Sequence, residues 1–238
     1  GPPHTERRVS QTRTRRPVRG SAHLSNGGLV ATHLHSAIMS VLLWWPNVIG
    51  YVRVVLAAAA FAVASTSHWA FFSLYTISQL LDAMDGFVAR QLQQCSLFGA
   101  VLDMIIDRTC NVAMCILVAS ARPALAAPVC LLSTLDVASH WFAVVATHTV
   151  SGGNHKKGDL HWILRVYYRP AVLFAVVAGN ESFFVLLYMQ RFEPRLAFAG
   201  LALCLPCFAF RQCVNVVQML SAVDRLAALE GGGMERAE

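Results

Sequence analysis

Residues 81–108 read LDAMDGFVARQLQQCSLFGAVLDMIIDR, and four aspartates stand in this otherwise apolar stretch: Asp82, Asp85, Asp103 and Asp107. Ionised carboxylates are costly in hydrocarbon, so they persist where they face a cavity or a cation. The first two aspartates are spaced i, i+3 and the last two i, i+4. Each pair therefore lies on one face of a helix.

A turn near Gln94 would bring these two helix faces together. The two outer aspartates are almost equidistant from Gln94 along the chain, and so are the two inner ones. Arg108 adjoins Asp107 but cannot balance four negative charges, so internal ion pairing does not explain the cluster. We therefore predict a site for divalent metal, holding two ions, near one membrane surface.

The composition is that of a membrane protein. Of the 238 residues, 56% are hydrophobic and only 13% are charged, whereas soluble domains carry about 25% charged residues. Six apolar segments each approach the ~20 residues that a membrane-spanning helix needs. They cover 42–65, 69–90, 98–120, 124–148, 168–190 and 196–221. The sequence thus predicts an all-α, polytopic six-helix bundle.

The ends of the chain differ from this membrane domain, which we expect to span 39–225. Residues 1–38 are polar and rich in arginine, and we expect a disordered basic tail there. A mitochondrial transit peptide would also be arginine-rich and poor in acids, so this alternative stays open. Residues 226–238 are expected to form a flexible C-terminal tail.

The distribution of basic residues predicts the orientation. Arginines and lysines gather in both termini and in the loop at 149–168, so we expect these segments in the cytosol, together with the turn near Gln94. No basic stripe with interleaved aromatics is present, which argues against a nucleic-acid partner. Cys204 and Cys207 have CxxC spacing but no second pair or histidine nearby, and we interpret them as packing residues.

The residues between the aspartates suit phosphoryl transfer. Hard carboxylate oxygens are ligands for Mg²⁺ or Mn²⁺, and the sequence does not distinguish these two metals. Gly86 and Ala89 leave room for a bulky group to approach the backbone. Arg90 offers several donors to a phosphate.

The whole pattern, D-x2-D-G-x2-A-R-x8-G-x3-D-x3-D, resembles the signature of the CDP-alcohol phosphatidyltransferase family, whose members have six membrane helices. The resemblance makes all four aspartates metal ligands and makes Asp107 the general base as well. It assigns contacts with the CDP-linked lipid to Gly86, Arg90 and Ser96. Residues 46–53, PNVIGYVR, are similar to the start of the first span in this family. Asn47 and Arg53 in this stretch, together with Ala89, are further candidate substrate contacts.

Four later motifs resemble the eukaryotic phosphatidylinositol synthases of this family: LDVASHW (135–141), HK (155–156), LRVYY (164–168) and AGNE (178–181). The resemblance implies transfer of the phosphatidyl group of CDP-diacylglycerol to inositol, with release of CMP, at the endoplasmic reticulum membrane. Asp136 and His140 share a helix face and are candidate substrate contacts. Other polar groups that could bind a polyol are Ser139, Lys156, Arg165 and Asn180.

Two alternatives and one open question remain at this stage. Another transferase of the family would use glycerol 3-phosphate, serine or diacylglycerol as acceptor. A phosphorylated acceptor needs several cations, and the fourth span has none around Asp136, which favours a neutral alcohol. A divalent-cation transporter is the second alternative, but no acidic ladder leads to the far side of the membrane. The resemblance also allows a homodimer, although no sequence stripe establishes an interface.

Overall fold

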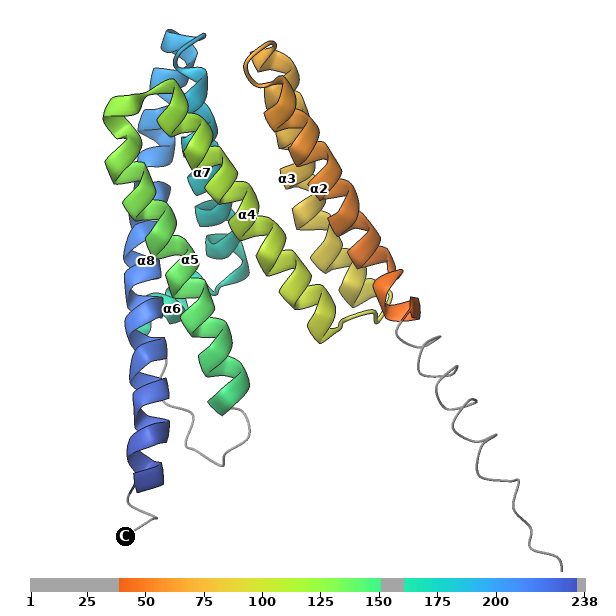
Figure 1. Cartoon of the computed structure of the whole chain (residues 1–238), viewed down its shortest axis with the longest axis vertical. Coiled ribbons are helices and arrows are strands. Elements are labelled where there is room, and N and C mark those ends of the chain that lie inside the picture. The colour runs from red at the N-terminus through yellow and green to blue at the C-terminus, as the bar shows by residue number, and fades with distance from the viewer. Residues whose placement is uncertain (1–38, 151–160, 235–238) are drawn as a thin grey trace, which may run out of the picture. The chain divides into compact units, whose positions relative to one another are not determined.

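The computed structural model describes residues 39–150 and 161–234, and this part of the chain is all-α (Figure 1). The chain divides into two units, Gly1–Leu43 and Trp44–Glu238, and the long helices of the described residues belong to the second. These are α2 (Trp45–Val63), α3 (His68–Gln91), α4 (Leu97–Ala121), α5 (Ala126–Val150), α7 (Pro170–Met189) and α8 (Pro194–Met234). A 3-10 turn, η1 (Pro123–Leu125), and a short helix, α6 (Trp162–Tyr167), complete the unit.

Each of the six apolar segments forms one long helix, so the all-α prediction is confirmed. Two features go beyond it. The short helix α6 was not predicted. In addition, α8 continues through Met234 and so includes residues 226–234 of the expected tail. Residues 226–229 are Leu, Ala, Ala and Leu, all strong helix formers, which favours this continuation.

Four of the described helical segments are long and apolar enough to cross a membrane: Trp45–Val63, Pro123–Thr149, Pro170–Met189 and Pro194–Leu229. The other two long helices, α3 and α4, have 24 and 25 residues and carry the aspartates. Large apolar side chains point outward from several helices, among them Leu131, Phe198 and Leu203. Such exposure is typical of helices that face lipid.

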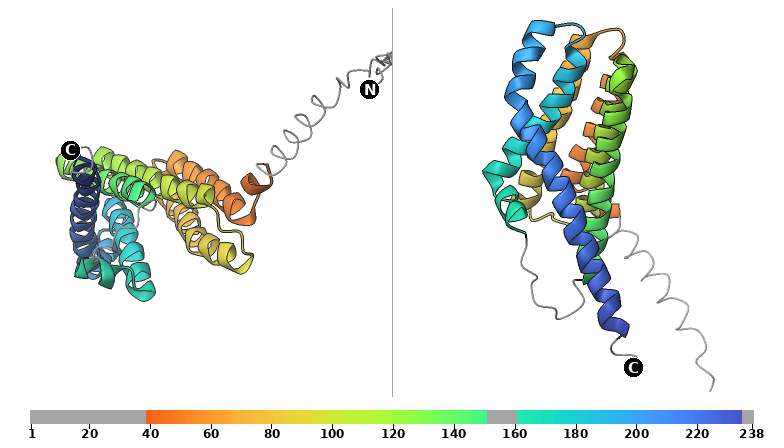
Figure 2. Two further views of the ribbon diagram at one scale, coloured as in Figure 1. Left: turned by 90° about the horizontal axis from the view of Figure 1, so that it is seen from below. Right: turned by 90° about the vertical axis from the view of Figure 1, so that its left-hand side faces the viewer.

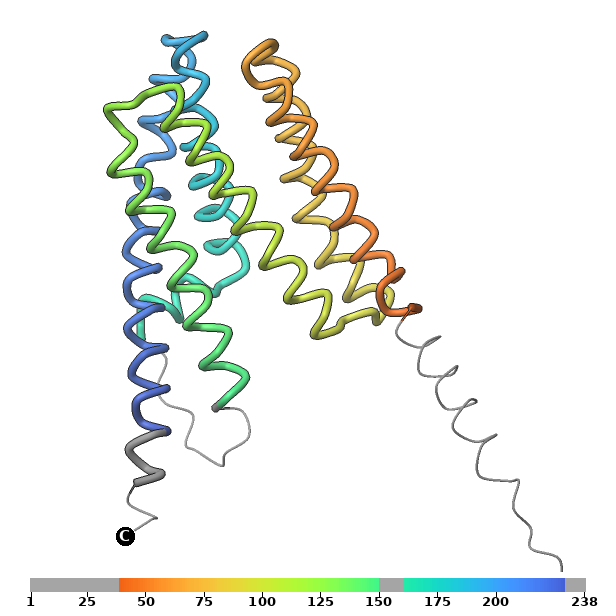
Figure 3. Tube along the Cα trace, in the orientation of Figure 1, coloured from red at the N-terminus to blue at the C-terminus, as the bar shows by residue number. Residues whose placement is uncertain are grey.

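Helix α4 joins two groups of helices. It contacts α2, which forms a hairpin with α3, and it also contacts α5 and α7. The 41-residue helix α8 packs along α5 and α7 (Figures 1 and 2). Figure 3 shows that the α3–α4 turn lies at the same end of the unit as the start of α2. Residues from α2, α3 and α4 can therefore meet at that end.

The turn between α3 and α4 is fixed by specific local contacts. Ser96 caps α4, because its hydroxyl accepts a hydrogen bond of 2.9 Å from the amide of Gly99. Gln93 adopts a left-handed conformation with φ of 55°, which reverses the chain direction. The Gln94 side chain accepts a 3.0 Å hydrogen bond from the amide of Trp45, which ties the turn to α2.

Apolar packing fills the opposite end of the α2–α3 hairpin. Ala57 and Ala60 on α2 and Ala64, which caps it, are buried and let the helices approach closely. Phe71 and Tyr75 of α3 join the same core, together with residues of α4 and α7. These apolar contacts hold α2 and α3 together at the end away from the α3–α4 turn. The polar side chains of the aspartate cluster lie at the end that carries the α3–α4 turn.

Candidate metal centre

Three of the four aspartates converge as a potential metal site. Carboxylate oxygens of Asp82 and Asp85 on α3 and of Asp103 on α4 lie within 4.8 Å of one another. The predicted turn near Gln94 contributes to this convergence, because it brings the end of α3 and the start of α4 to the same end of α2, against which both helices pack. The donors are all hard oxygens, the type that Mg²⁺ and Mn²⁺ prefer. The residues present therefore fit a divalent metal.

A buried arginine from α2 contacts all four aspartates. The guanidinium of Arg53 lies 2.5 Å from Asp82, 3.1 Å from Asp85, 2.8 Å from Asp103 and 2.7 Å from Asp107. The residue is fully buried, with 0% of its surface exposed. Arg53 thus acts as the shared counter-ion of the cluster.

Arg108 was the one cation expected beside the aspartates. The cation that pairs with all four is Arg53, which is 32 residues from Asp85 in the sequence. The pairing depends on the packing of α2 against α3 and α4, so no spacing within residues 81–108 reveals it. One arginine leaves three of the four negative charges unbalanced, and the cluster still favours additional cations.

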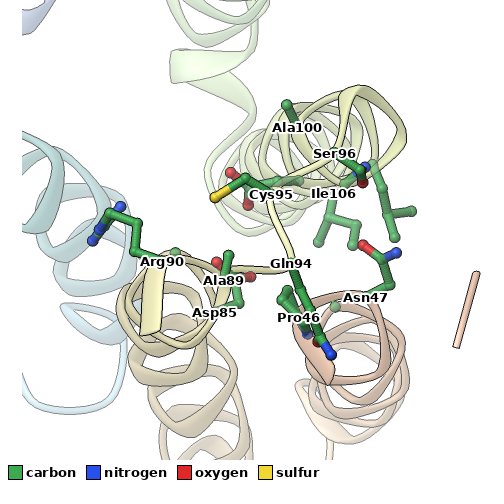
Figure 4. Close-up of a pocket in the computed structure, with 15 residues that line it drawn as sticks. Pro46, Asn47, Asp85, Ala89, Arg90, Gln94, Cys95, Ser96, Ala100 and Ile106 are labelled. Atoms are coloured by element: carbon green, nitrogen blue, oxygen red, sulfur yellow. The ribbon is translucent and has the colours of Figure 1, made fainter. Parts of the chain in front are cut away.

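A cavity of about 210 Å³ adjoins the aspartates at the α3–α4 turn. It is lined by five of the residues predicted to contact substrate, Asn47, Gly86, Ala89, Arg90 and Ser96, and by Asp85 and Asp103. In Figure 4, Asn47 of α2 points toward α4 beside Ser96, while Arg90 extends away from Pro46 and Gln94. The cavity therefore joins the metal candidates to the residues expected to bind the CDP-linked lipid.

Of two glycines at this cavity, one is in a tight position. A Cβ atom at Gly86 would lie 3.4 Å from Nη1 of Arg90, which is an ordinary van der Waals contact. A Cβ atom at Gly99 would lie 3.0 Å from Oδ1 of Asn47 and 3.1 Å from the Ser96 hydroxyl. Glycine at this position lets α4 begin close to α2.

A second polar cluster surrounds Asp136 of α5. Arg108 of α4 donates to both carboxylate oxygens of Asp136, at 2.7 and 2.6 Å. Asn111 and Asn215 donate to it at 3.0 and 3.3 Å, and Arg211 of α8 lies 3.5 Å away. The fourth span has no cation of its own around Asp136, as expected, but two cations from other helices, Arg108 and Arg211, lie beside it.

His140 has both ring nitrogens engaged. Nδ1 lies 2.6 Å from the backbone carbonyl of Asp136, and Nε2 lies 3.1 Å from the Arg211 guanidinium. A carbonyl only accepts and an arginine only donates, so Nδ1 carries the proton and the imidazole is neutral. Arg211 also donates to the Tyr167 hydroxyl. In this structure His140 orients Arg211.

The two clusters are adjacent. Nη2 of Arg108 lies 3.6 Å from Oδ2 of Asp107, so the ion pairs run from Arg53 through Asp107 and Arg108 to Asp136. The sequence also carries a signal for the cluster around Asp136. Arg211, Asn215 and Gln218 are spaced as one face of a helix in an apolar segment, and polar residues inside a span are usually functional.

Of the remaining predicted polar residues, Ser139 belongs to the cluster around Asp136. Asn180 accepts a hydrogen bond of 3.2 Å from Gln212, and the Ser139 hydroxyl donates to the backbone carbonyl of Asp136. Arg165 is exposed on α6. Lys156 lies outside the described residues. Glu181 accepts a 3.1 Å hydrogen bond from Tyr75, which links α7 to α3.

The cysteines Cys204 and Cys207 are free thiols on α8. A Cβ atom at Gly179 of α7 would lie 2.5 Å from Cβ of Cys207, so the two helices are in close contact there. This contact supports the interpretation of Cys207 as a packing residue.

Comparison with known proteins gives a consistent result. Residues 43–189 match the family model for CDP-alcohol phosphatidyltransferase. The chain is 36% identical over 202 residues to CDP-diacylglycerol–inositol 3-phosphatidyltransferase of Rattus norvegicus, covering 80% of this chain and 94% of the relative. Proteins of the same name are 37% identical in Saccharomyces cerevisiae, over 78% and 87% of the two chains, and 34% identical in Arabidopsis thaliana, over 78% and 89%. No solved structure gave a significant match.

Proposed function

The chain belongs to the CDP-alcohol phosphatidyltransferase family, a family of multi-pass membrane proteins, and on that premise we propose that it is a phosphatidylinositol synthase. It transfers the phosphatidyl group of CDP-diacylglycerol to inositol and releases CMP. The observation that carries this proposal is the similarity to inositol phosphatidyltransferases over about four fifths of the chain, in rat and in yeast. The oxygen-only cluster of Asp82, Asp85 and Asp103 suits the divalent metal of such a reaction.

The four aspartates are the proposed holders of the metal, as two Mg²⁺ or Mn²⁺ ions. Bound metal would neutralise charge on the diphosphate of the substrate and on the departing CMP. Arg53 holds all four carboxylates toward one point through its ion pairs. A site arranged in advance loses little free energy to rearrangement when the reaction takes place.

Asp107 is the proposed general base. It takes a proton from an inositol hydroxyl, and the oxygen of that hydroxyl forms a bond to the phosphorus on the lipid side. The bond from this phosphorus to the CMP oxygen breaks, and the electron pair leaves with CMP. Arg53 and Arg108 both contact the Asp107 carboxylate, so its orientation is fixed before the acceptor arrives.

The cavity at the α3–α4 turn is the proposed site for the CDP end of the lipid. Arg90 reaches the phosphates, and Ser96 and Asn47 supply polar groups at the opposite wall. Gly86 and Ala89 leave space for the nucleotide against α3. Bidentate contacts of an arginine with phosphate are among the stronger polar interactions in proteins, so Arg90 also fixes the position of the leaving group.

The proposal includes a topology. All six long helices span the endoplasmic reticulum membrane, residues 39–225 form the catalytic domain, and the α3–α4 turn faces the cytosol. The excess of basic residues in the expected cytosolic segments supports this orientation. A homodimer is compatible with it.

An acceptor screen tests the function. The purified protein in CDP-diacylglycerol micelles is incubated with inositol, glycerol 3-phosphate, serine or diacylglycerol, each with and without EDTA. We expect CMP release with inositol alone, its loss in EDTA and its return with Mg²⁺ or Mn²⁺. CMP release with a different acceptor would identify another transferase of the family. Divalent-ion flux into liposomes without any CMP release would identify a transporter.

A further inference from the structure

The cluster around Asp136 has the donor set of an anion-binding site. Two arginines and two asparagines from α4 and α8 direct N–H groups at this one carboxylate: Arg108, Arg211, Asn111 and Asn215. Arginine forks and amide donors that converge in this way are also the groups that bind a phosphate. Asp136 therefore fills, from within the chain, a site that a phosphate group would fit.

The charges of the cluster make Asp136 decisive. Arg108 and Arg211 contribute two positive charges, and His140 is neutral because of its two hydrogen bonds. Asp136 is the one acid within ion-pair distance of Arg211 among the described residues, and Nη1 of Arg108 donates to both of its carboxylate oxygens. The side chain of Asp136 and that of Arg211 are each only 5% exposed, so water only weakly screens the attraction between their charges.

The cluster also lies where an acceptor alcohol would arrive. Arg108 contacts Asp107, the proposed base, at 3.6 Å. An acceptor with its hydroxyl at Asp107 therefore has its remaining groups near Arg108. A phosphorylated acceptor would gain from free arginines there, whereas a neutral polyol would not.

We propose that Asp136 determines acceptor specificity: its carboxylate occupies the donor groups of Arg108 and Arg211 and so prevents the site from binding a phosphorylated alcohol. The inference rests on the proposed function, because it concerns the acceptor of the same reaction. It replaces the expectation that a lack of nearby cations favours a neutral acceptor. In this structure the cations are present, and an internal carboxylate occupies their donor groups.

The test is Asp136→Asn, which keeps the shape of the side chain and removes its charge. We expect inorganic phosphate to inhibit inositol-dependent CMP release at about tenfold lower concentration than in the wild type, since two arginines become available. We also expect inorganic phosphate to raise the melting temperature of the variant more than that of the wild type. KM for inositol should rise more than kcat falls, and myo-inositol 1-phosphate should become a better acceptor.

Asp224→Asn is the matched control, because it makes the same charge change at an exposed position on α8. It should respond to phosphate as the wild type does. A folded Asp136→Asn protein whose phosphate response equals that of Asp224→Asn would overturn the proposal. The melting measurement needs no acceptor, so it separates this failure from failure of the proposed function, in which the wild type releases no CMP with inositol.

A double variant covers the case in which Asp136→Asn does not fold. With Arg211→Gln added, the double variant has lost one charge of each sign, and Nη1 of Arg108 still lacks the carboxylate of Asp136. We expect phosphate to raise the melting temperature of this double variant, by less than in a folded single variant. No rise above the wild-type response would overturn the proposal.

Discussion

Arg53 is the residue on which the electrostatics of the aspartate cluster depends. It is fully buried and makes ion pairs of 2.5–3.1 Å with four carboxylates. A buried ion pair contributes little relative to apolar packing, but removing one partner leaves charge without compensation. In this cluster four acids share one arginine, so its removal affects all four at once.

We expect Arg53→Met to destabilise the protein by about 3–5 kcal/mol in EDTA, because the carboxylates then repel one another without a shared counter-ion. Melting in detergent measures this change. Mn²⁺ should restore part of the lost stability and should raise the melting temperature of the variant more than that of the wild type. Arg195→Met, at an exposed position on α8, is the control. Equal melting of the two variants in EDTA would mean that the ion pairs add nothing to stability.

Asp107→Asn tests the general base. An amide cannot accept the hydroxyl proton, so we expect kcat for CMP release to fall at least about 100-fold. Asp224→Asn should keep wild-type activity. Binding of Mn²⁺, followed by its paramagnetic signal, distinguishes loss of the base from collapse of the metal site. The base assignment is wrong if Asp107→Asn releases CMP at a nearly normal rate.

The helices show what sequence periodicity predicts and what it does not. Apolar segment length located all six long helices, and the spacing of Asp82, Asp85 and Asp103 predicted their shared site. Both inferences rest on local regularities. The partners of Arg53 and Asp136 are set by helix packing and lie on other helices, so one sequence alone does not identify them. The short helix α6 carries no such regularity and was missed.

The close packing of α7 against α8 predicts how much stability is lost when either of two glycines at this contact becomes alanine. Gly179 faces Cβ of Cys207, which is bonded directly to the backbone, whereas Gly200 faces Cδ1 of Leu186, the far end of a flexible side chain. Gly179→Ala should therefore force the helices apart and cost about 1–3 kcal/mol. Gly200→Ala should cost less, because Leu186 can turn away. Thermal melting of the two variants in the same detergent compares them, and the opposite order would contradict this account of the contact.

At the scale of the whole molecule, polar and apolar contacts are separated along the helices. The alanine and aromatic core holds the α2–α3 hairpin at one end, and the aspartates, the cavity and the α3–α4 turn lie at the other. Charged groups near one membrane surface can meet a water-soluble acceptor while the acyl chains of a lipid substrate stay in the bilayer. The separation thus suits a reaction between a lipid and a soluble alcohol.

The side of the membrane that carries the α3–α4 turn can be measured directly. Cys95 lies in this turn and is exposed, so it reports the orientation of the proposed site. In sealed microsomes with their cytosolic face outward, we expect a membrane-impermeant maleimide to label Cys95 without detergent. Cys130 and Cys213 are also exposed, so the test uses a variant in which both are serine, and adding Cys95→Ser to that variant should remove the labelling. If labelling of Cys95 required detergent, the turn would face the lumen, and CDP-diacylglycerol would have to present its nucleotide on that side.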